Sequence, residues 1–344
     1  MELMQEVRTD LARWLREGRT VALATLVAYE RSSPRMPGAA MALNEGGDVA
    51  GSVSGGCVEG DLYEHLQTAL RTGESTMLDY GISDDQGFAV GLSCGGTIHV
   101  FVERLKGPAW WLERLGGEAP LALATAVRGE QAGARVLVTE DGQVEGASGD
   151  PALDAALAAA ARDGLAHGRT GLTPDGAIFV STRVPPPRLF AFGAVEFSRA
   201  LAAAGRLLGY HVVVADARPV FATPERFPEA DEVLCRWPHE VLAEARLSPR
   251  DAVCVLTHDL KFDVPALRVA LSSPAGYIGA LGSRRTQARR RIALLAEGVA
   301  AAEIDRIAAP IGLDIGADTP TEFAVCVLAE IIAAAHGRPP KGKG

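Results

Sequence analysis

The spacing of apolar residues predicts a different kind of sheet in each half of the chain. In the first half, short apolar runs are separated by turn residues, a pattern typical of antiparallel strands. The segment Asn44-Glu-Gly-Gly-Asp48 is a hairpin signal between two of these runs. Apolar residues at helical spacing predict an amphipathic helix over residues 1–18, rather than a signal peptide. The predicted strands span residues 20–28, 40–43, 49–53 and 97–102.

The first half also contains an internal repeat. Residues 21–25 and 41–51 recur in modified form at 121–125 and 136–146, and each copy is followed by a helical pattern. When one residue is skipped after Gly51, residues 148–151 align with residues 54–57, and the second copy has no cysteine opposite Cys57. We infer that the fold does not require Cys57, which favours a functional role for it.

Beyond the proline run at residues 184–187, strands alternate with helices, as they do in a parallel doubly wound sheet. The last helix opens with Thr319, Pro320 and Glu322, a capping box with proline at the first helical position. The predicted strands are 188–192, 211–215, 232–235, 252–256 and 276–281, and the predicted helices are 196–208, 238–244, 264–271, 284–296 and 320–335.

These patterns predict an α/β protein, with an N-terminal α+β domain that carries the duplication and a C-terminal Rossmann-like doubly wound parallel sheet. The expected boundaries are 1–183 for the first domain (halves of about 1–105 and 106–183), 184–187 for the linker, 188–335 for the Rossmann-like domain and 336–344 for a disordered tail.

Charge and cysteine content narrow the functional classes. A formal charge of −9 argues against a general binder of nucleic acid or of membrane surfaces, and no apolar run reaches the roughly 18 residues of a membrane span. The five cysteines form no C-x-x-C pair, which argues against a zinc site or a disulfide scaffold and fits a reducing cytoplasm. Three of them, Cys235, Cys254 and Cys326, lie in apolar patterns and are expected in the core.

Cys57 is the strongest candidate for chemistry. It follows Gly55 and Gly56, which permit a tight turn and a close approach to a ligand, and it precedes a predicted helix. The unpaired amides of a helix start favour a thiolate or a bound anion, whereas the carboxylates of Glu59 and Asp61 oppose it. The alternative is a small buried side chain at a turn.

Two further sites lie in the first domain. Cys94 stands beside Gly95 and Gly96 ahead of a strand, so that the cysteine and glycine pattern occurs twice; the glycines are equally consistent with a bulge. Arg35 lies between two prolines on a stiff loop and is either an anion contact or a solvated surface charge.

The second domain has the layout of a dinucleotide fold without its full fingerprint. Gly193 ends the first strand, and Asp216 lies about 20 residues further on, where an acid would hold a ribose. Val195 places a branched side chain where a pyrophosphate would approach, and Glu196 adds negative charge there. We therefore do not expect ordinary NAD(P) binding.

Polar residues also follow two later strands, at the edge of the sheet where ligands bind. His258 and Asp259 follow the fourth strand and are weaker ligand candidates. Ser283, Arg284 and Arg285 combine a hydroxyl, two guanidinium groups and a helix start, which suits a phosphate. The alternative is a capped helix whose basic face continues through Arg289, Arg290 and Arg291.

Across most of its length the chain resembles the XdhC/CoxI family of xanthine dehydrogenase accessory proteins. The resemblance rests on motifs in both domains. These are Ser33-Pro-Arg35 with Gly38, Ser54-Gly-Gly-Cys-Val-Glu-Gly-Asp61, Ser93-Cys-Gly-Gly96, Leu256-Thr-His-Asp259, Lys261-Phe-Asp-Val-Pro-Ala-Leu267, Tyr277-Ile-Gly-Ala-Leu-Gly-Ser-Arg-Arg-Thr286 and Pro310-Ile-Gly-Leu-Asp-Ile-Gly316. Residues 193–196 depart from it, because the family usually has Gly-Ala-Gly-His there.

The resemblance implies a cytoplasmic chaperone that binds molybdenum cofactor, protects it and inserts the sulfurated form into a hydroxylase of the xanthine dehydrogenase or CO dehydrogenase type, without turnover of its own. Cys57 and Cys94 would be the cofactor-domain thiols, with Cys57 a soft ligand near molybdenum. The implied partners are the client hydroxylase, a cysteine desulfurase and a molybdopterin nucleotidyltransferase, with homo-oligomers expected. The expected cofactor-binding residues are Arg35, Gly55, Gly56, Cys57, Glu59, Cys94, Gly95, Gly96, Gly193, Asp216, His258, Asp259, Ser283, Arg284 and Arg285.

Two other functions remain open from the sequence. One is an NAD(P)-dependent Rossmann oxidoreductase with a thiol-bearing substrate domain. The other is a scaffold that docks a hydroxylase to a sulfurtransferase and binds no cofactor.

Overall fold

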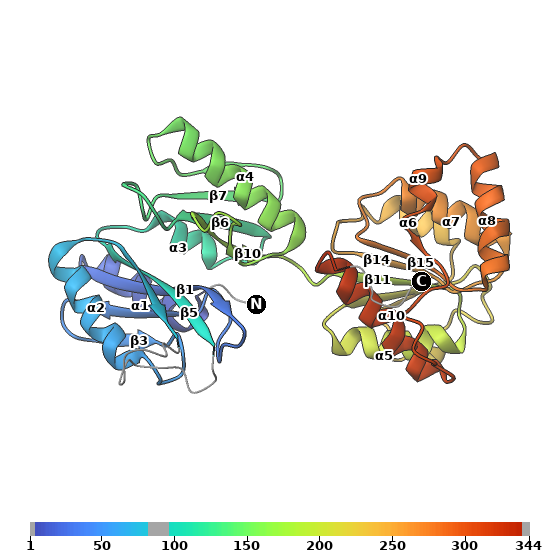
Figure 1. The fold of residues 1–344 in the computed structure, drawn as a ribbon, viewed down its shortest axis with the longest axis horizontal. Helices are drawn as coiled ribbons and strands as arrows, with labels where there is room; N and C mark the ends of the chain where they lie inside the picture. Colours follow the sequence, from blue (N-terminus) through green and yellow to red (C-terminus); the bar gives the residue numbers. More distant parts are fainter. Residues whose placement is uncertain (1–3, 82–95, 339–344) are drawn as a thin grey trace. The chain divides into compact units, whose positions relative to one another are not determined.

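A computed structural model describes residues 4–81 and 96–338 of the protein (Figure 1). The chain forms two compact units, residues 1–184 and 185–344. The first is built on antiparallel sheets and the second on a parallel one, as the predicted fold class requires.

The first unit consists of two halves with the same topology. Its sheets have the strand orders β3-β2-β1-β5-β4 and β8-β7-β6-β10-β9. In the sequence, a helix follows β3 in the first half and β8 in the second. The predicted duplication is thus a repeat of the fold. The first half comprises α1 (Gln5–Arg16), β1 (Val21–Glu30), β2 (Ala40–Asn44), β3 (Val49–Gly51), α2 (Glu59–Thr72), β4 (Thr76–Tyr80) and β5 (Thr97–Leu105). The second comprises α3 (Trp110–Leu115), β6 (Leu121–Ala126), β7 (Arg135–Thr139), β8 (Val144–Glu145), α4 (Pro151–His167), β9 (Gly171–Leu172) and β10 (Ile178–Arg183).

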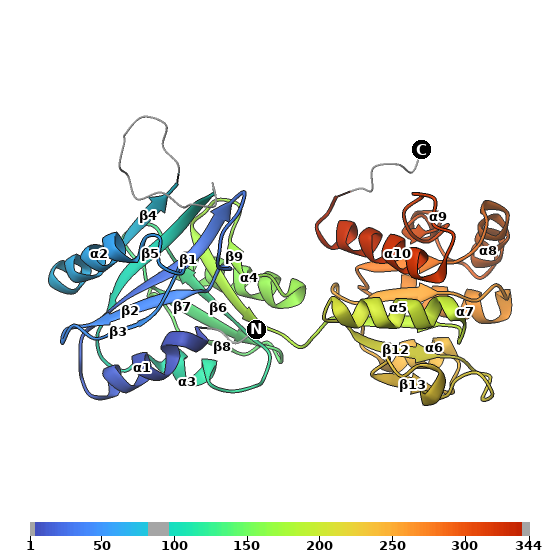
Figure 2. The same cartoon turned by 90° about the horizontal axis from the view of Figure 1, so that it is seen from below.

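The two halves share one core. Because successive side chains of a strand point to opposite faces, Val21 and Leu23 of β1 join Leu121 and Leu123 of β6 in one buried cluster with α1 and α3. Figure 2 shows α1 and α3 side by side. The opposite faces of the two sheets are covered by α2 and α4 respectively. Both faces of β1 are therefore buried, which explains its unbroken apolar run.

The second unit is a six-stranded parallel sheet in the order β13-β12-β11-β14-β15-β16. Helices α6, α7 and α8 pack on one face, and α5 and α10 on the other (Figure 1). The strands are β11 (Arg188–Phe192), β12 (His211–Ala215), β13 (Glu232–Leu234), β14 (Ala252–Val255), β15 (Tyr277–Ala280) and β16 (Ile307–Ala308). The α-helices are α5 (Glu196–Leu207), α6 (Pro238–Glu244), α7 (Leu260–Leu271), α8 (Arg284–Ala296), α9 (Ala301–Ile304) and α10 (Pro320–Ala335), with a short 3₁₀ helix at Pro224–Arg226.

The elements of this unit agree with the apolar pattern to within a few residues, and the capping box at Thr319 and Glu322 forms as predicted. The short elements β16 and α9 were not predicted from the sequence. One core prediction is wrong: Cys254 and Cys326 are buried, but Cys235 is exposed. Cys235 follows β13 at the edge of the sheet, and neither of the apolar clusters on the two faces of this sheet includes it.

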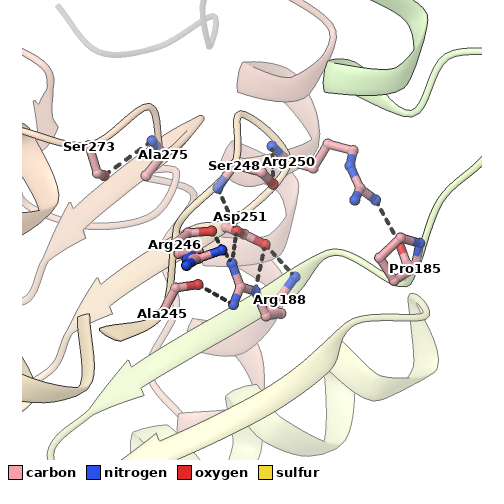
Figure 3. Close-up of polar contacts among 9 residues, drawn as sticks. All are labelled: Pro185, Arg188, Ala245, Arg246, Ser248, Arg250, Asp251, Ser273 and Ala275. Atoms are coloured by element: carbon pink, nitrogen blue, oxygen red, sulfur yellow. Dashed lines mark hydrogen bonds and ion pairs between the residues drawn. The ribbon is translucent and has the colours of Figure 1, made fainter. Parts of the chain in front are cut away.

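A partly buried ion pair anchors the start of the sheet (Figure 3). The Arg188 guanidinium binds the Asp251 carboxylate at 2.6 Å and donates to the carbonyls of Ala245 and Arg246. Arg250 donates to the Pro185 carbonyl at 2.7 Å (Figure 3). Part of the proline segment is therefore hydrogen-bonded to the second unit.

Candidate functional site

The loop before α2 displays the Cys57 thiol. Cys57 is exposed, while its neighbours Val53 and Val58 are fully buried and hold both ends of the loop in the core. The interpretation of Cys57 as a buried packing residue is thus wrong. Gly55 and Gly56 have φ angles of +86° and +124°, which side-chain-bearing residues rarely adopt. No atom lies near the position of a Cβ at either glycine, so backbone conformation, and not a close approach, requires them.

The carboxylate of Glu59 fills this loop. It accepts seven hydrogen bonds, from two hydroxyl groups and five backbone amides of the preceding residues. The donors are the hydroxyls of Ser52 and Ser54 (both 2.6 Å) and the amides of Val53 (3.2 Å), Ser54 (2.9 Å), Gly55 (3.1 Å), Gly56 (2.8 Å) and Val58 (3.2 Å). The glycine amides that the sequence pattern suggested for a ligand are therefore bound to the protein's own carboxylate.

This environment keeps Glu59 ionised. Burial alone would raise its pKa, but the hydrogen bonds from Ser52 and Ser54 outweigh burial and lower the pKa of Glu59 from 4.5 to about 2. A group whose pKa falls on folding stabilises the fold above its unfolded pKa. The contribution of Glu59 is therefore complete above about pH 4.5 and is lost as the pH falls toward 2.

The second half repeats this arrangement in a reduced form. Asp154, in the first turns of α4, accepts a hydrogen bond from the Ser148 amide at 2.6 Å, and contacts with Ser148 and Gly149 lower the pKa of Asp154. Asp150 separately caps α4. Both halves thus place a carboxylate against the loop before the helix, but a thiol accompanies it only in the first.

Gly96 and Arg35 have internal partners. A Cβ on Gly96 would lie 1.8 Å from the Ser32 carbonyl oxygen, so close backbone packing at the start of β5 requires this glycine. The Arg35 guanidinium pairs with Glu6 of α1 at 2.5 Å and is partly exposed. Cys94 and Gly95 lie outside the described residues, and their predicted role stays a prediction.

The predicted ribose contact is already occupied. Asp216 is 3% exposed, and its carboxylate accepts hydrogen bonds from the Ala194 amide (2.8 Å) and from Arg218 (2.7 and 2.9 Å). Burial would raise the pKa of Asp216, but these donors outweigh it and lower that pKa. Because both oxygens already accept hydrogen bonds within the protein, this geometry does not support the ribose role.

Gly193 also has a packing explanation. Its φ angle is +108°, and a Cβ there would lie 2.8 Å from the Thr257 side chain. The turn after β11 therefore packs tightly against the end of β14. Glu196 opens α5 with an exposed carboxylate, as the sequence indicated.

Two of the predicted ligand residues at the carboxyl edge of the sheet act as helix caps. Asp259 accepts from the Lys261 amide at the start of α7, and Ser283 accepts from the Thr286 amide at the start of α8. His258, Arg284 and Arg285 are exposed. Asp259 and Ser283 are exposed as well, but their side chains are engaged in capping, so His258, Arg284 and Arg285 are the better placed of the five to meet a ligand at this edge.

The arginine run of α8 is not a uniform solvated face. Arg290 and its partner Asp263 of α7 are both 0% exposed, with Arg290 Nη2 and Asp263 Oδ2 2.7 Å apart. The guanidinium also donates to the carbonyls of Thr257 and Leu281, at the ends of β14 and β15. Arg291, in contrast, forms an exposed pair with Asp305. Arg290 therefore ties two strand ends together beneath the predicted phosphate site.

A cavity of about 640 Å³ opens beside this edge. Its lining includes Arg284, Phe323 and Cys326 together with residues 309–314. The buried Glu330 carboxylate fixes this loop, since it accepts from the Gly312 amide and the Tyr277 hydroxyl, both at 2.7 Å. The volume falls within the roughly 300–1,000 Å³ of small-molecule pockets.

Sequence reasoning missed Glu330 and the Asp263–Arg290 pair. A signal for each was present, because Glu330 is a lone charge in the apolar run of α10 and Asp263 lies in the apolar pattern of α7. A charge within an apolar stretch requires a buried partner, but the stretch does not identify that partner.

Neither a metal cluster nor a membrane span occurs in the described residues. Within residues 4–81 and 96–338, no group of three or more His, Cys, Asp or Glu side chains is arranged to hold a metal ion. None of the helices in these same ranges has the length and apolar character needed to cross a membrane.

Family models match both units. The model described as the XdhC Rossmann domain matches residues 189–331, and that of the XdhC and CoxI family matches residues 14–81 and 115–174. The matched ranges contain Cys57, Glu59 and Arg284. Neither model covers the segment around Cys94.

Individual relatives match along nearly the whole chain. A protein described as a probable xanthine dehydrogenase subunit, from Bacillus subtilis, is 31% identical over 96% of this chain and 97% of its own length. The molybdenum cofactor insertion chaperone PaoD from Escherichia coli is 27% identical over 92% of this chain and 84% of its own length. A crystal structure described as a xanthine dehydrogenase from Bacillus halodurans superposes with a TM-score of 0.58, at 26% identity and 96% coverage of both chains.

Proposed function

The chain belongs to the XdhC and CoxI family, and on this premise we propose that it binds molybdenum cofactor, protects it and inserts its sulfurated form into a molybdenum hydroxylase of the xanthine dehydrogenase or CO dehydrogenase type. The similarity to PaoD, a cofactor insertion chaperone by name, supports this proposal. The cofactor is cargo here, and the protein needs no turnover of its own.

The exposed Cys57 thiol is the observation that carries the proposal. A thiolate is a soft ligand that suits molybdenum and sulfur chemistry, and only an exposed one can meet a bulky cargo. The loop that displays it is fixed at both ends by the core and internally by Glu59. We propose that Cys57 contacts the metal end of the cargo during protection and transfer.

The second unit offers a place for an anionic group. Arg284 lines the cavity beside the capped start of α8, and Arg285 follows it. Guanidinium groups and helix amides together are the usual protein ligands of phosphate. We propose that this edge holds a phosphate-bearing ligand. His258, which directly precedes the cap of α7, is a further contact in this proposal.

The client hydroxylase is the principal partner in this proposal, with a cysteine desulfurase and a molybdopterin nucleotidyltransferase as further partners. We also propose a homo-oligomer that works in the cytoplasm. NAD(P) has no role in it, because Val195 and Glu196 stand at the pyrophosphate position and Asp216 is bound to Ala194 and Arg218.

Cargo carried by the purified protein tests the function. The full chain, purified gently from cells that make the cofactor, is expected to release a fluorescent pterin after acid oxidation. NAD(P)H turnover without a partner would instead identify an oxidoreductase, and client binding without any pterin would identify a scaffold. Saturable NAD(P)H binding well below millimolar concentration, which corresponds to more than about 4 kcal/mol, would contradict the proposal for the second unit.

The phosphate site is tested by a double change, Arg284→Ala with Arg285→Ala. We expect a loss of affinity for a phosphate-bearing ligand of roughly 1.5–3 kcal/mol for each charge-assisted hydrogen bond removed. Arg289→Ala with Arg291→Ala is the matched control, since it removes the same charge from the same helix. Equal affinity of both double variants in a titration would assign Arg284 and Arg285 to the solvated surface.

A further inference from the structure

The loop before α2 has the construction of an anion-binding site. Gly55 and Gly56 both adopt positive φ angles, so that successive backbone amides converge on one point. Such concave arrangements of amides bind phosphates and other anions in many proteins. Here two serine hydroxyls at 2.6 Å complete the ring of donors.

Glu59 also determines how the thiol is held. Its carboxylate accepts from the amides on both sides of Cys57, those of Gly56 and Val58. The Cys57 amide donates to the Ser54 hydroxyl, which in turn donates to Glu59. All three amides around the thiol are therefore tied to one carboxylate, directly or through Ser54, while the side chain of Cys57 is exposed.

We propose that Glu59 is a positioning residue that acts as an internal anion: it occupies the loop of residues 52–58, fixes the backbone on both sides of Cys57 and excludes phosphate from the loop. If the cargo is the one proposed above, its phosphate must lie elsewhere, and its metal–dithiolene end is the part that meets Cys57. This last step rests on the proposed function, whereas the role of Glu59 in the loop does not.

The loop of the second half provides a matched control. Asp154 contacts Ser148 and Gly149 there, but no thiol is present and Asp150 caps the helix independently. Asp154→Ala therefore removes the carboxylate that contacts the corresponding loop of the second half and leaves the Cys57 loop unchanged. A general loss of stability would be shared by both variants, and an effect on the thiol would not.

The experiment uses the full chain without cargo, so that its outcome is independent of the cofactor proposal. Glu59→Ala should open the loop to added anions. We expect formate or inorganic phosphate to raise the melting temperature of Glu59→Ala by several degrees more than chloride at equal ionic strength. Wild type and Asp154→Ala should show no difference between these anions and chloride.

The reactivity of the thiol is the second measurement. Alkylation of Cys57 by iodoacetamide, followed peptide by peptide in a mass spectrometer, should become several-fold faster in Glu59→Ala, because the amides on both sides of Cys57 are no longer fixed by one carboxylate and the exposed thiol moves more freely. Added formate should slow it again. Asp154→Ala should react at the wild-type rate.

Glu59→Gln is the second variant, for the case that Glu59→Ala does not fold. It keeps the shape of the side chain and removes its charge. Faster alkylation that formate does not reverse is expected for it, because the amide fills the site. Unchanged alkylation in Glu59→Gln, or an equal response of Glu59→Ala and Asp154→Ala to formate, would overturn the proposal. Protection of wild-type Cys57 by phosphate would also overturn it, because the loop would then be open to anions.

Discussion

A Cys57→Ser variant is expected to fold like the wild type and to lose its cargo. The side chain is exposed, so exchanging sulfur for oxygen should change stability by less than about 0.5 kcal/mol. The second half supports this expectation, because it forms the same topology without a cysteine at the corresponding loop. The hydroxyl of serine is a poor ligand for a soft metal centre at neutral pH.

The effect on function should be large. Loss of even a supporting contact at a metal site costs roughly 10–100-fold in affinity, so loss of a direct thiolate should reduce cofactor retention at least that much. The measurement is the pterin content of the purified protein together with activation of a client hydroxylase. Cys235→Ser is the matched control, since it alters another exposed thiol, in the second unit. If Cys57→Ser delivers the cofactor to the client hydroxylase as the wild type does, the Cys57 thiol is dispensable. Cys94 would then be the candidate for the thiol that contacts the cofactor.

An Asp263→Asn variant is expected to destabilise the second unit strongly. Asp263 and Arg290 are both 0% exposed and lie 2.7 Å apart, so the substitution leaves a buried guanidinium without its counter-charge. Removing one partner of a buried ion pair costs about 3–5 kcal/mol. The free energy of unfolding, measured by denaturant titration, should fall by that amount.

Its control is the neighbouring exposed pair. Asp305→Asn removes the partner of Arg291 from a pair in which the side chains are 39% and 66% exposed. Exposed pairs contribute about 0–1 kcal/mol, so this variant should unfold nearly as the wild type does. Similar losses in the two variants would mean that burial does not determine the strength of the Asp263–Arg290 pair.

The placement of Arg290 also links this prediction to the proposed phosphate site. The guanidinium donates to carbonyls at the ends of β14 and β15, directly before the helix starts that carry His258 and Arg284. Loss of Asp263 should therefore loosen the edge of the sheet as well as lower stability. We expect weaker phosphate binding in this variant at temperatures where it is still folded.

The apolar periodicity alone determined most of the fold. The alternation of strand and helix patterns after residue 187 predicted a parallel sheet, and β11 and β12 begin and end where the pattern does. The repeat within the first unit was visible because each half must bury the corresponding faces of a sheet with the same topology. Short elements such as β16 were missed, because two residues carry too little periodicity.

The sequence also indicated candidate residues for chemistry, but the tertiary structure decided what each one contacts. Gly55, Gly56 and Asp216 have the residue types and spacing of ligand contacts, yet their hydrogen-bonding groups are satisfied by Glu59, and by Arg218 and Ala194. Arg289, Arg290 and Arg291 are alike in sequence, but only the burial of Arg290 against Asp263 separates it from the others. The physical reason is that a polar group bonds to whichever donor or acceptor folding brings within about 3 Å, and that distance depends on how the segments pack.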